Sequence, residues 1–167
     1  FADYSYNADS MLVASSNTIA NNAGGPGLRV DTLNDPSARV SEISDNILWH
    51  NGSVDLSLGN FDSANNALIV DYNTIGVATG YTPDASNLSF DPHFVNEAAG
   101  NYALASNSSA INSGALFQVW GFPARDITGG ARIVGSRIDR GAYESSIDDT
   151  TTAIVSLRPQ GSAQDFL

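Results

Sequence analysis

The chain has 167 residues, a formal net charge of −11 and no cysteine, and arginine supplies all seven of its basic residues. A chain of this length is usually one domain. The lack of cysteine excludes disulfides, thiolate metal sites and cysteine nucleophiles. The shortage of positive charge argues against a nucleic-acid partner, because phosphate binding needs clustered cations. No apolar run approaches the roughly 18 residues that a membrane span requires.

Short apolar runs bounded by turn-forming residues fill the first half of the chain. Their lengths are those of β-strands, and long helical periodicity is absent. In the run from Val54 to Leu58, apolar residues alternate with Asp55 and Ser57, which is the pattern of a strand with one buried face. The predicted strands are Met11–Val13, Leu28–Val30, Ile47–Trp49, Val54–Leu58 and Leu68–Val70.

These runs belong to a repeat. Residues 17–22 (NTIANN) align with residues 46–51 (NILWHN), and residues 73–76 (NTIG) are a weaker third copy. The copies are offset by 29 and then 27 positions, and periods of 20 to 50 residues indicate a solenoid, propeller or array. Short strands with Asn-rich turns favour a parallel β-solenoid.

Stacked coils would place equivalent residues above one another. We therefore expect Ile19, Leu48 and Ile75 to stack in the core. Asn22 and Asn51 should stack at a turn, where side-chain amides can hydrogen-bond along the axis as a ladder. The first coil would also expose a sheet edge, to which another chain or another part of a longer protein could add a strand.

The repeat stops near Tyr81, and a different pattern follows: the motifs 91–96 (DPHFVN), 100–104 (GNYAL), 109–114 (SAINSG) and 126–144 (DITGGARIVGSRIDRGAYE). This pattern resembles the C-terminal end of bacterial secreted right-handed parallel β-helix proteins of the pectin-lyase-like superfamily. The resemblance implies an all-β fold, a right-handed parallel β-helix with a non-repeating C-terminal cap. It divides the chain into coils at 1–80, a closing region at 81–144 and a tail or final strand at 145–167.

Within the closing motif, we expect charged residues and glycines to act structurally. Arg132 should pair with Asp139 or Glu144, and glycines should lie at bends where a side chain would clash. The motif is shared by β-helix proteins of unrelated activity, so it indicates architecture rather than chemistry. The residues assigned a structural role are Asp126, Arg132, Asp139, Gly141 and Glu144.

Carboxylates in the coils are the candidates for catalysis. Enzymes of the resembled superfamily carry Asp or Glu with Lys or Arg on the outer face of adjacent coils, where lyases need a base and hydrolases need two spaced carboxylates. No such pair can be placed from the sequence, and we expect these side chains to be solvated outer-face residues. They are Asp31, Asp35, Glu42, Asp45, Asp55 and Asp71, with Arg29 and Arg39 as the nearby cations.

Aromatic residues offer a second kind of site, because their faces suit the apolar faces of sugar rings. Most of them are expected to seal the core or the cap, and Trp120 and Phe122 are the candidates for contact with a substrate. His50 and His93 lack metal-ligand spacing and are expected to be structural or surface residues. No metal site is predicted, although Ca²⁺ on surface carboxylates would suit so acidic a chain.

The expected function is therefore structural. The chain would be the C-terminal segment of a secreted or bacterial cell-surface β-helix protein involved in adhesion, assembly or glycan contact, with no catalytic centre of its own. The alternative is the C-terminal part of an extracellular polysaccharide lyase or glycoside hydrolase whose catalytic coils lie upstream. Expected partners are another part of the parent protein or a neighbouring chain at the open edge, and a polysaccharide.

Overall fold

The structure is a computed structural model that describes residues 11–33, 40–61 and 67–149. Over these residues the chain is all-β, as the sequence predicted, with one short 3₁₀ turn (Glu97–Ala99) and no α-helix. The strands are β1 (Val13–Ser15), β2 (Thr18–Ala20), β3 (Leu28–Leu33), β4 (Val40–Ser44), β5 (Ile47–Trp49), β6 (Leu56–Phe61), β7 (Ala67–Asp71), β8 (Thr74–Ile75), β9 (Ala78–Thr79), β10 (Phe94–Asn96) and β11 (Asn101–Leu104).

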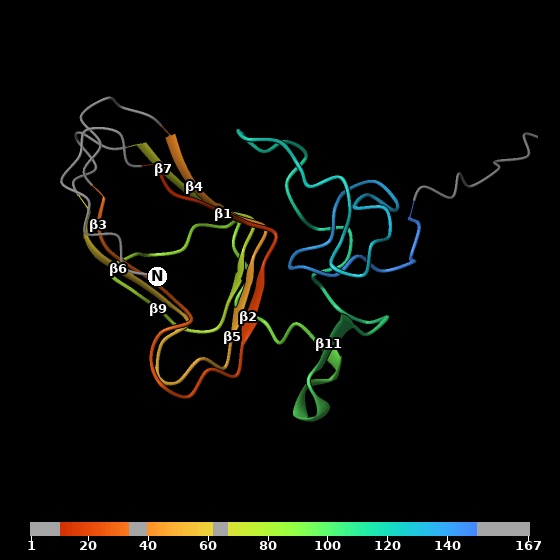
Figure 1. Cartoon of the computed structure of the whole chain (residues 1–167), viewed down its shortest axis with the longest axis horizontal. Coiled ribbons are helices and arrows are strands. Elements are labelled where there is room, and N and C mark those ends of the chain that lie inside the picture. Colours follow the sequence, from red (N-terminus) through yellow and green to blue (C-terminus); the bar gives the residue numbers. More distant parts are fainter. Residues whose placement is uncertain (1–10, 34–39, 62–66, 150–167) are drawn as a thin grey trace, which may run out of the picture.

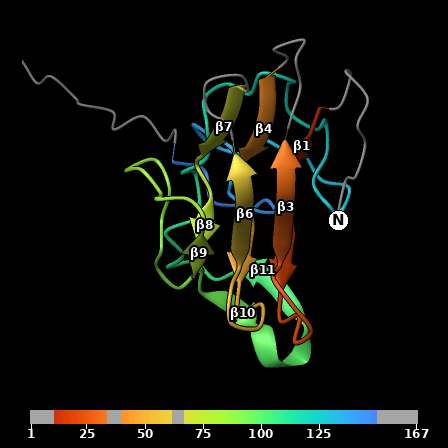
Figure 2. The ribbon, with the colours of Figure 1, turned by 90° about the vertical axis from the view of Figure 1, so that its left-hand side faces the viewer.

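Nine of these strands form three sheets with the orders β1–β4–β7, β2–β5–β8 and β3–β6–β9, and every pairing within them is parallel. Each pass of the chain supplies one strand to each sheet. We call these passes coil 1 (β1 to β3), coil 2 (β4 to β6) and coil 3 (β7 to β9). Figure 1 looks along the stack, and Figure 2 shows β3 and β6 side by side. The arrangement is compatible with a solenoid of the β-helix kind.

The register places the predicted core residues above one another. Ile19 is opposite Leu48, and Leu48 is opposite Ile75, which confirms the alignment of the three repeats. Leu48, Ile43 and Leu56 are 0 % exposed at the centre of this interior. Burying a side chain of this size stabilises a fold by about 1.5–3 kcal/mol, so the inward-facing positions of coil 2 are the main source of hydrophobic stability.

A ladder of asparagines runs along the corner between the first two sheets. Asn17 donates from its backbone N and its Nδ2 to Oδ1 of Asn46, both over 3.0 Å. Asn46 does the same to Asn73 (3.0 and 2.9 Å), and Asn73 to Asn87 (both 3.0 Å). Leu88 forms a parallel bridge with Thr74, so the ladder gains a fourth rung beyond coil 3.

The predicted ladder of Asn22 and Asn51 is also confirmed. Asn22 donates from its backbone N (3.2 Å) and Nδ2 (2.7 Å) to Oδ1 of Asn51. Asn51 in turn donates from the same two groups to Oδ1 of Asp55, over 2.7 and 3.0 Å. Oδ2 of Asp55 accepts from the backbone N of Val77 at 2.8 Å. Coil 3 contributes no asparagine to this ladder, and the carboxylate of Asp55 accepts in its place.

The remaining described chain lies outside the three sheets. Strands β10 and β11 pair antiparallel, and residues 105–149 contain only turns, bends and an isolated bridge between Arg125 and Ala131. Figure 1 shows this segment beside the stack, next to the sheet β2–β5–β8. Its contacts reach all three coils, because Ala142 N donates to Thr18 Oγ1, Gly141 N to Asp45 O and Arg140 Nη1 to Asn73 O.

Gly141 explains how closely the segment approaches the outer face of that sheet. A Cβ at this position would lie 2.6 Å from Thr18 Oγ1 and 2.8 Å from Cδ1 of Ile47. Its φ of +90° is a conformation that L side chains rarely adopt. Only glycine therefore fits, and Ile47 is 1 % exposed beneath it although it points away from the interior.

Candidate functional site

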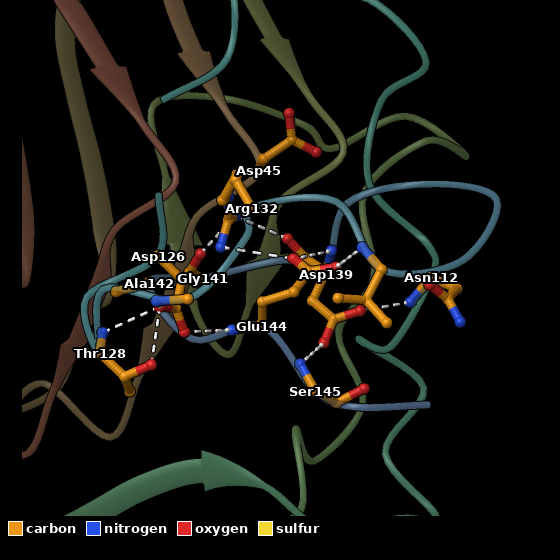
Figure 3. A network of polar contacts seen from close by, with 12 residues as sticks. Asp45, Asn112, Asp126, Thr128, Arg132, Asp139, Gly141, Ala142, Glu144 and Ser145 are labelled. Atoms are coloured by element: carbon orange, nitrogen blue, oxygen red, sulfur yellow. Dashed lines mark hydrogen bonds and ion pairs between the residues drawn. The ribbon is translucent and has the colours of Figure 1, made fainter. Parts of the chain in front are cut away.

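We call residues 105–149 the closing segment. Its buried charged residues gather along the side of the stack (Figure 3). Asp45, in the turn between β4 and β5, is a charged coil residue that is hydrogen-bonded to this segment. Asp45 is 0 % exposed. Its Oδ1 accepts from the backbone N of Ala115 at 2.7 Å, and its Oδ2 accepts from Nε2 of Gln118. Burial raises the pKa of Asp45 in spite of these hydrogen bonds.

Arg140 is the cation whose charge acts most strongly on this carboxylate. Its Nη1 donates to Asn73 O at 2.7 Å, and its Nε and Nη2 donate to Ser113 O at 3.1 and 2.9 Å. The guanidinium carbon lies 5.8 Å from the ring centroid of Tyr72. Burial lowers the pKa of Arg140 to about 10, and the attraction of Asp45 opposes that shift. Arg140 is therefore still a cation at neutral pH, and it joins coil 3 to the closing segment.

Arg132 occupies the centre of the second part of the network. Its Nη2 donates to the backbone oxygens of Asp139 (2.8 Å) and Gly141 (2.7 Å). Its Nη1 lies 3.7 Å from Oε2 of Glu144, with both side chains 2 % exposed. The expected ion pair of Arg132 is thus with Glu144, while Asp139 contributes its carbonyl group. Burial lowers the pKa of Arg132.

Besides the ion pair of Glu144 with Arg132, the carboxylates of Glu144 and Asp139 hold backbone amides. Glu144 accepts from the backbone N of Val134 (3.0 Å) and of Asp139 (3.1 Å). The carboxylate of Asp139 accepts from the backbone N of Asn112 (2.7 Å) and of Ser145 (2.6 Å). Burial raises the pKa of both groups, and that of Glu144 reaches about 7. These carboxylates therefore fix the path of the backbone.

Asp126 has a similar role at the edge of the network. Its Oδ1 accepts from Thr128 N (3.0 Å), Thr128 Oγ1 (2.7 Å) and Gly130 N (2.8 Å), and its Oδ2 accepts from Glu144 N (3.1 Å). Burial alone would raise its pKa, but the hydrogen bonds from Thr128, Glu144 and Gly130 outweigh it and lower the pKa. The structure thus brings together all five residues assigned a structural role.

The prediction that the coil carboxylates are solvated is wrong for three of them. Glu42, Asp45 and Asp55 are 2 %, 0 % and 3 % exposed. Asp55 is buried because it terminates the second asparagine ladder, and Asp45 because the closing segment covers its turn. Glu42 accepts from Ser44 Oγ at 2.8 Å within β4. A buried carboxylate is tolerated where it is hydrogen-bonded, and the sequence alone does not reveal such partners.

The other coil carboxylates are less enclosed. Asp31 pairs with Arg29 in coil 1, where both side chains are at least one-third exposed. Asp71 is half-buried at the end of β7. Burial raises the pKa of Asp71 to about 6, and the negative charges of Asp45, Glu42 and Asp84 add to the shift. Asp35 and Arg39 lie outside the described residues.

Segment 116–120 carries four exposed apolar residues around the buried Gln118, and it contacts β4 through Trp120. Leu116, Phe117 and Trp120 are 68 %, 77 % and 49 % exposed. The indole Nε1 of Trp120 donates to Val40 O at 3.2 Å, which fixes one edge of the ring against β4. Phe122 is half-buried. Of the two aromatic candidates, Trp120 thus offers the larger accessible face.

The histidines are exposed. His50 lies at a corner of coil 2, and its Nδ1 is 2.7 Å from Oε1 of Glu97. His93 precedes β10 and has its backbone N bonded to Asp91 at 2.7 Å. Within the described residues, no three His, Cys, Asp or Glu side chains are close enough together to hold a metal ion.

Two further findings bear on identity. None of the described segments forms a helix long and apolar enough to cross a membrane. No family model matches the sequence, and no curated protein or solved structure matches it.

Proposed function

We propose that this chain is a length of right-handed parallel β-helix with a structural role in a secreted or bacterial cell-surface protein, where it contacts glycans through Trp120. Three parallel sheets, each taking one strand from each coil, support the β-helix assignment. The observation that carries the structural role is that the closing segment bonds to Thr18, Asp45 and Asn73, one residue in each coil. Its buried charges are used to hold the coils together.

The state of the carboxylates supports a role without catalysis. Glycoside hydrolysis needs two carboxyl groups that face the substrate. Glu42 and Asp45 are almost fully enclosed, and Asp45 has both oxygens occupied by Ala115 and Gln118. Asp45 cannot reach a sugar without displacing the closing segment that covers it. Its hydrogen bonds instead connect the coils to that segment.

The alternative is a polysaccharide lyase or hydrolase, and one observation favours it. Asp71 is half-buried on the outer face of coil 3, and its pKa is raised to about 6. A carboxyl group in that range suits general acid or base catalysis near neutral pH. In this alternative, Asp71 would act with residues of further coils.

Glycan contact rests on the exposed segment 116–120. The ring of Trp120 is anchored by its indole N–H and 49 % exposed, so that an apolar sugar face can stack on it at little entropic cost. The net charge of −11 would repel polyanions at low salt. Neutral polysaccharides are therefore the expected class.

Affinity electrophoresis in gels containing a neutral β-glucan or polygalacturonate tests this proposal. The β-glucan should retard the wild-type protein, and Trp120→Ala should remove most of the retardation. Phe90→Ala is the matched control, because Phe90 is an exposed aromatic residue (67 %) that is not part of segment 116–120. Equal retardation of Trp120→Ala and wild type would contradict the glycan contact.

The same samples distinguish the enzymatic alternative. Incubation with each polysaccharide should release neither reducing ends nor the ultraviolet absorbance of unsaturated uronates. Product formation that disappears in Asp71→Asn would favour the lyase or hydrolase, and the structural role would then be abandoned.

A further inference from the structure

The edge of the stack formed by β1, β2 and β3 differs from the rest of the described molecule. Each of these strands takes an outside position in its sheet and pairs with only one described strand, namely β4, β5 or β6. Strands with one unpaired side are templates for the addition of another strand. We call this surface the coil-1 edge.

Both asparagine ladders end at the coil-1 edge with open acceptors. In the interior, Oδ1 of Asn46 accepts two hydrogen bonds from Asn17, and Oδ1 of Asn51 accepts two from Asn22. Among the described residues, no donor contacts Oδ1 of Asn17 or of Asn22. Asn17 directs its Nδ2 to Ser15 O at 3.0 Å within its own coil. Two acceptors five residues apart thus face outward.

The apolar interior is also uncovered at this edge. Ile19 and Ala14, in coil 1, are only partly buried. Their register partners in coil 2, Leu48 and Ile43, are both 0 % exposed. The difference is that coil 1 covers coil 2, and no described residue covers coil 1 in the same way. A further layer would bury this apolar surface, which is favourable.

The opposite end of the stack is closed. Asn87 ends the first ladder, with its backbone N bonded to Asp84 O and its Nδ2 to Val70 O. Asp55 ends the second ladder, because a carboxylate accepts hydrogen bonds but has no N–H to pass on. The closed end therefore offers no pair of amides to Asn17 and Asn22. Head-to-tail stacking of two copies would leave these acceptors unsatisfied.

We infer that the coil-1 edge is a docking surface for one further parallel coil that presents two asparagines five residues apart. Each asparagine would donate from its backbone N and Nδ2 to Asn17 or Asn22, repeating the geometry of the two coils below. Coils 1 and 2 of this chain both carry such a pair, Asn17 and Asn22 around Ile19 and Asn46 and Asn51 around Leu48, and coil 2 provides the sequence for a probe. The occupant is therefore a coil of the same repeat, and this inference does not depend on glycan contact.

A fluorescent peptide with the sequence of residues 40–58 is the probe, and the full chain is the receptor. Fluorescence anisotropy should show saturable binding. A control peptide with Asn46→Asp and Asn51→Asp keeps the length and the apolar residues but loses both side-chain NH₂ donors. It should bind at least tenfold more weakly. Equal binding of the two peptides, or no saturable binding up to millimolar concentration, would overturn the inference.

The location of binding is tested on both partners. In the chain, Asn17→Ala with Asn22→Ala should weaken peptide binding at least tenfold, while Thr79→Ala at the other end, in β9, should leave it unchanged. A peptide with a photoreactive leucine in place of Leu48 should cross-link to β2 around Ile19 of the unmodified chain, which keeps the test valid if the double variant folds poorly. Cross-links to β8 or β9 would place the peptide at the wrong end and refute the inference.

Discussion

The guanidinium Nη1 of Arg140 donates a hydrogen bond to the backbone oxygen of Asn73 over 2.7 Å, which joins residues 67 positions apart. Asn73 is itself a rung of the first asparagine ladder, where it donates to Asn87 and accepts from Asn46. One side chain of the closing segment is thus connected directly to the polar spine of the coils. The closing segment and the stack should therefore unfold as one cooperative unit.

Replacement of Arg140 by alanine should be strongly destabilising. The change removes the cation that acts most strongly on the buried Asp45, and it removes the donors to Asn73 O and Ser113 O. Loss of one partner of a buried charged network costs about 3–5 kcal/mol. Urea denaturation followed by circular dichroism measures the loss. Arg125→Ala is the control, because the Arg125 side chain is exposed and donates to Gly129 O, and it should cost under about 1 kcal/mol. Similar losses for both variants would contradict the role assigned to Arg140.

Gly141→Ala tests the close approach of the closing segment to the stack. The added Cβ would overlap Thr18 and Ile47, and φ is +90°. Overpacking and the backbone conformation together should cost roughly 2–4 kcal/mol. Two glycines separate these effects. Gly129→Ala has φ +86° with no atom within 4 Å and should cost about 1 kcal/mol, and Gly24→Ala should be close to neutral. The idea fails if the three variants unfold at the same urea concentration.

Asp55→Asn tests the end of the second ladder. Asp55 accepts from Asn51 at Oδ1 and from the backbone N of Val77 at Oδ2. An amide in its place must turn an NH₂ group toward one of these donors, which leaves a buried donor unpaired at a cost of about 1–3 kcal/mol. Asp91→Asn is the matched control, since Asp91 is exposed and accepts from His93 N. Thermal unfolding of both variants gives the comparison, and equal midpoints would show that the carboxylate is not required.

The sequence predicted the stacking of the coils but not all of the strands. The repeat of Asn and apolar residues was sufficient to align Ile19, Leu48 and Ile75. Equivalent positions of successive coils need the same kind of residue, which is Asn in the ladder and an apolar residue in the core. The strand β4 (Val40–Ser44) was not predicted, because its polar residues look solvent-exposed. Ser41 and Glu42 are in fact 3 % and 2 % exposed, and Ser41 Oγ accepts from Leu12 N in coil 1.

The candidate site was predictable only where its residues are close in the sequence. Arg132 and Glu144 are 12 positions apart in one motif, and their expected pairing is present at 3.7 Å. The environment of Asp45 depends on Ala115 and Gln118, which are 70 and 73 positions away. No local pattern indicates that these groups converge. Burial of a carboxylate by a distant segment is a property of the tertiary fold, so it could not be inferred from residue type and spacing.

The raised pKa values predict how stability depends on pH. Burial raises the pKa of Glu144 to about 7 and that of Asp71 to about 6, both above the values expected in the unfolded chain. Between pH 4.5 and 7 the folded state therefore binds more protons than the unfolded state, so stability falls as pH rises through this window. The contribution of these two groups to stability should be fully present below about pH 4 and lost above about pH 7.

Glu144→Gln isolates the largest part of this effect. The amide keeps an acceptor for Val134 N or Asp139 N and removes the titrating group next to Arg132. We expect the wild-type free energy of unfolding to fall by on the order of 2 kcal/mol from pH 5 to pH 7.5. The fall should be clearly smaller in Glu144→Gln, with Asp71→Asn removing a further part. Urea titrations at the two pH values measure it. If wild type and Glu144→Gln lose the same free energy, Glu144 is ionised throughout this window, and Arg132 then outweighs burial in setting its charge.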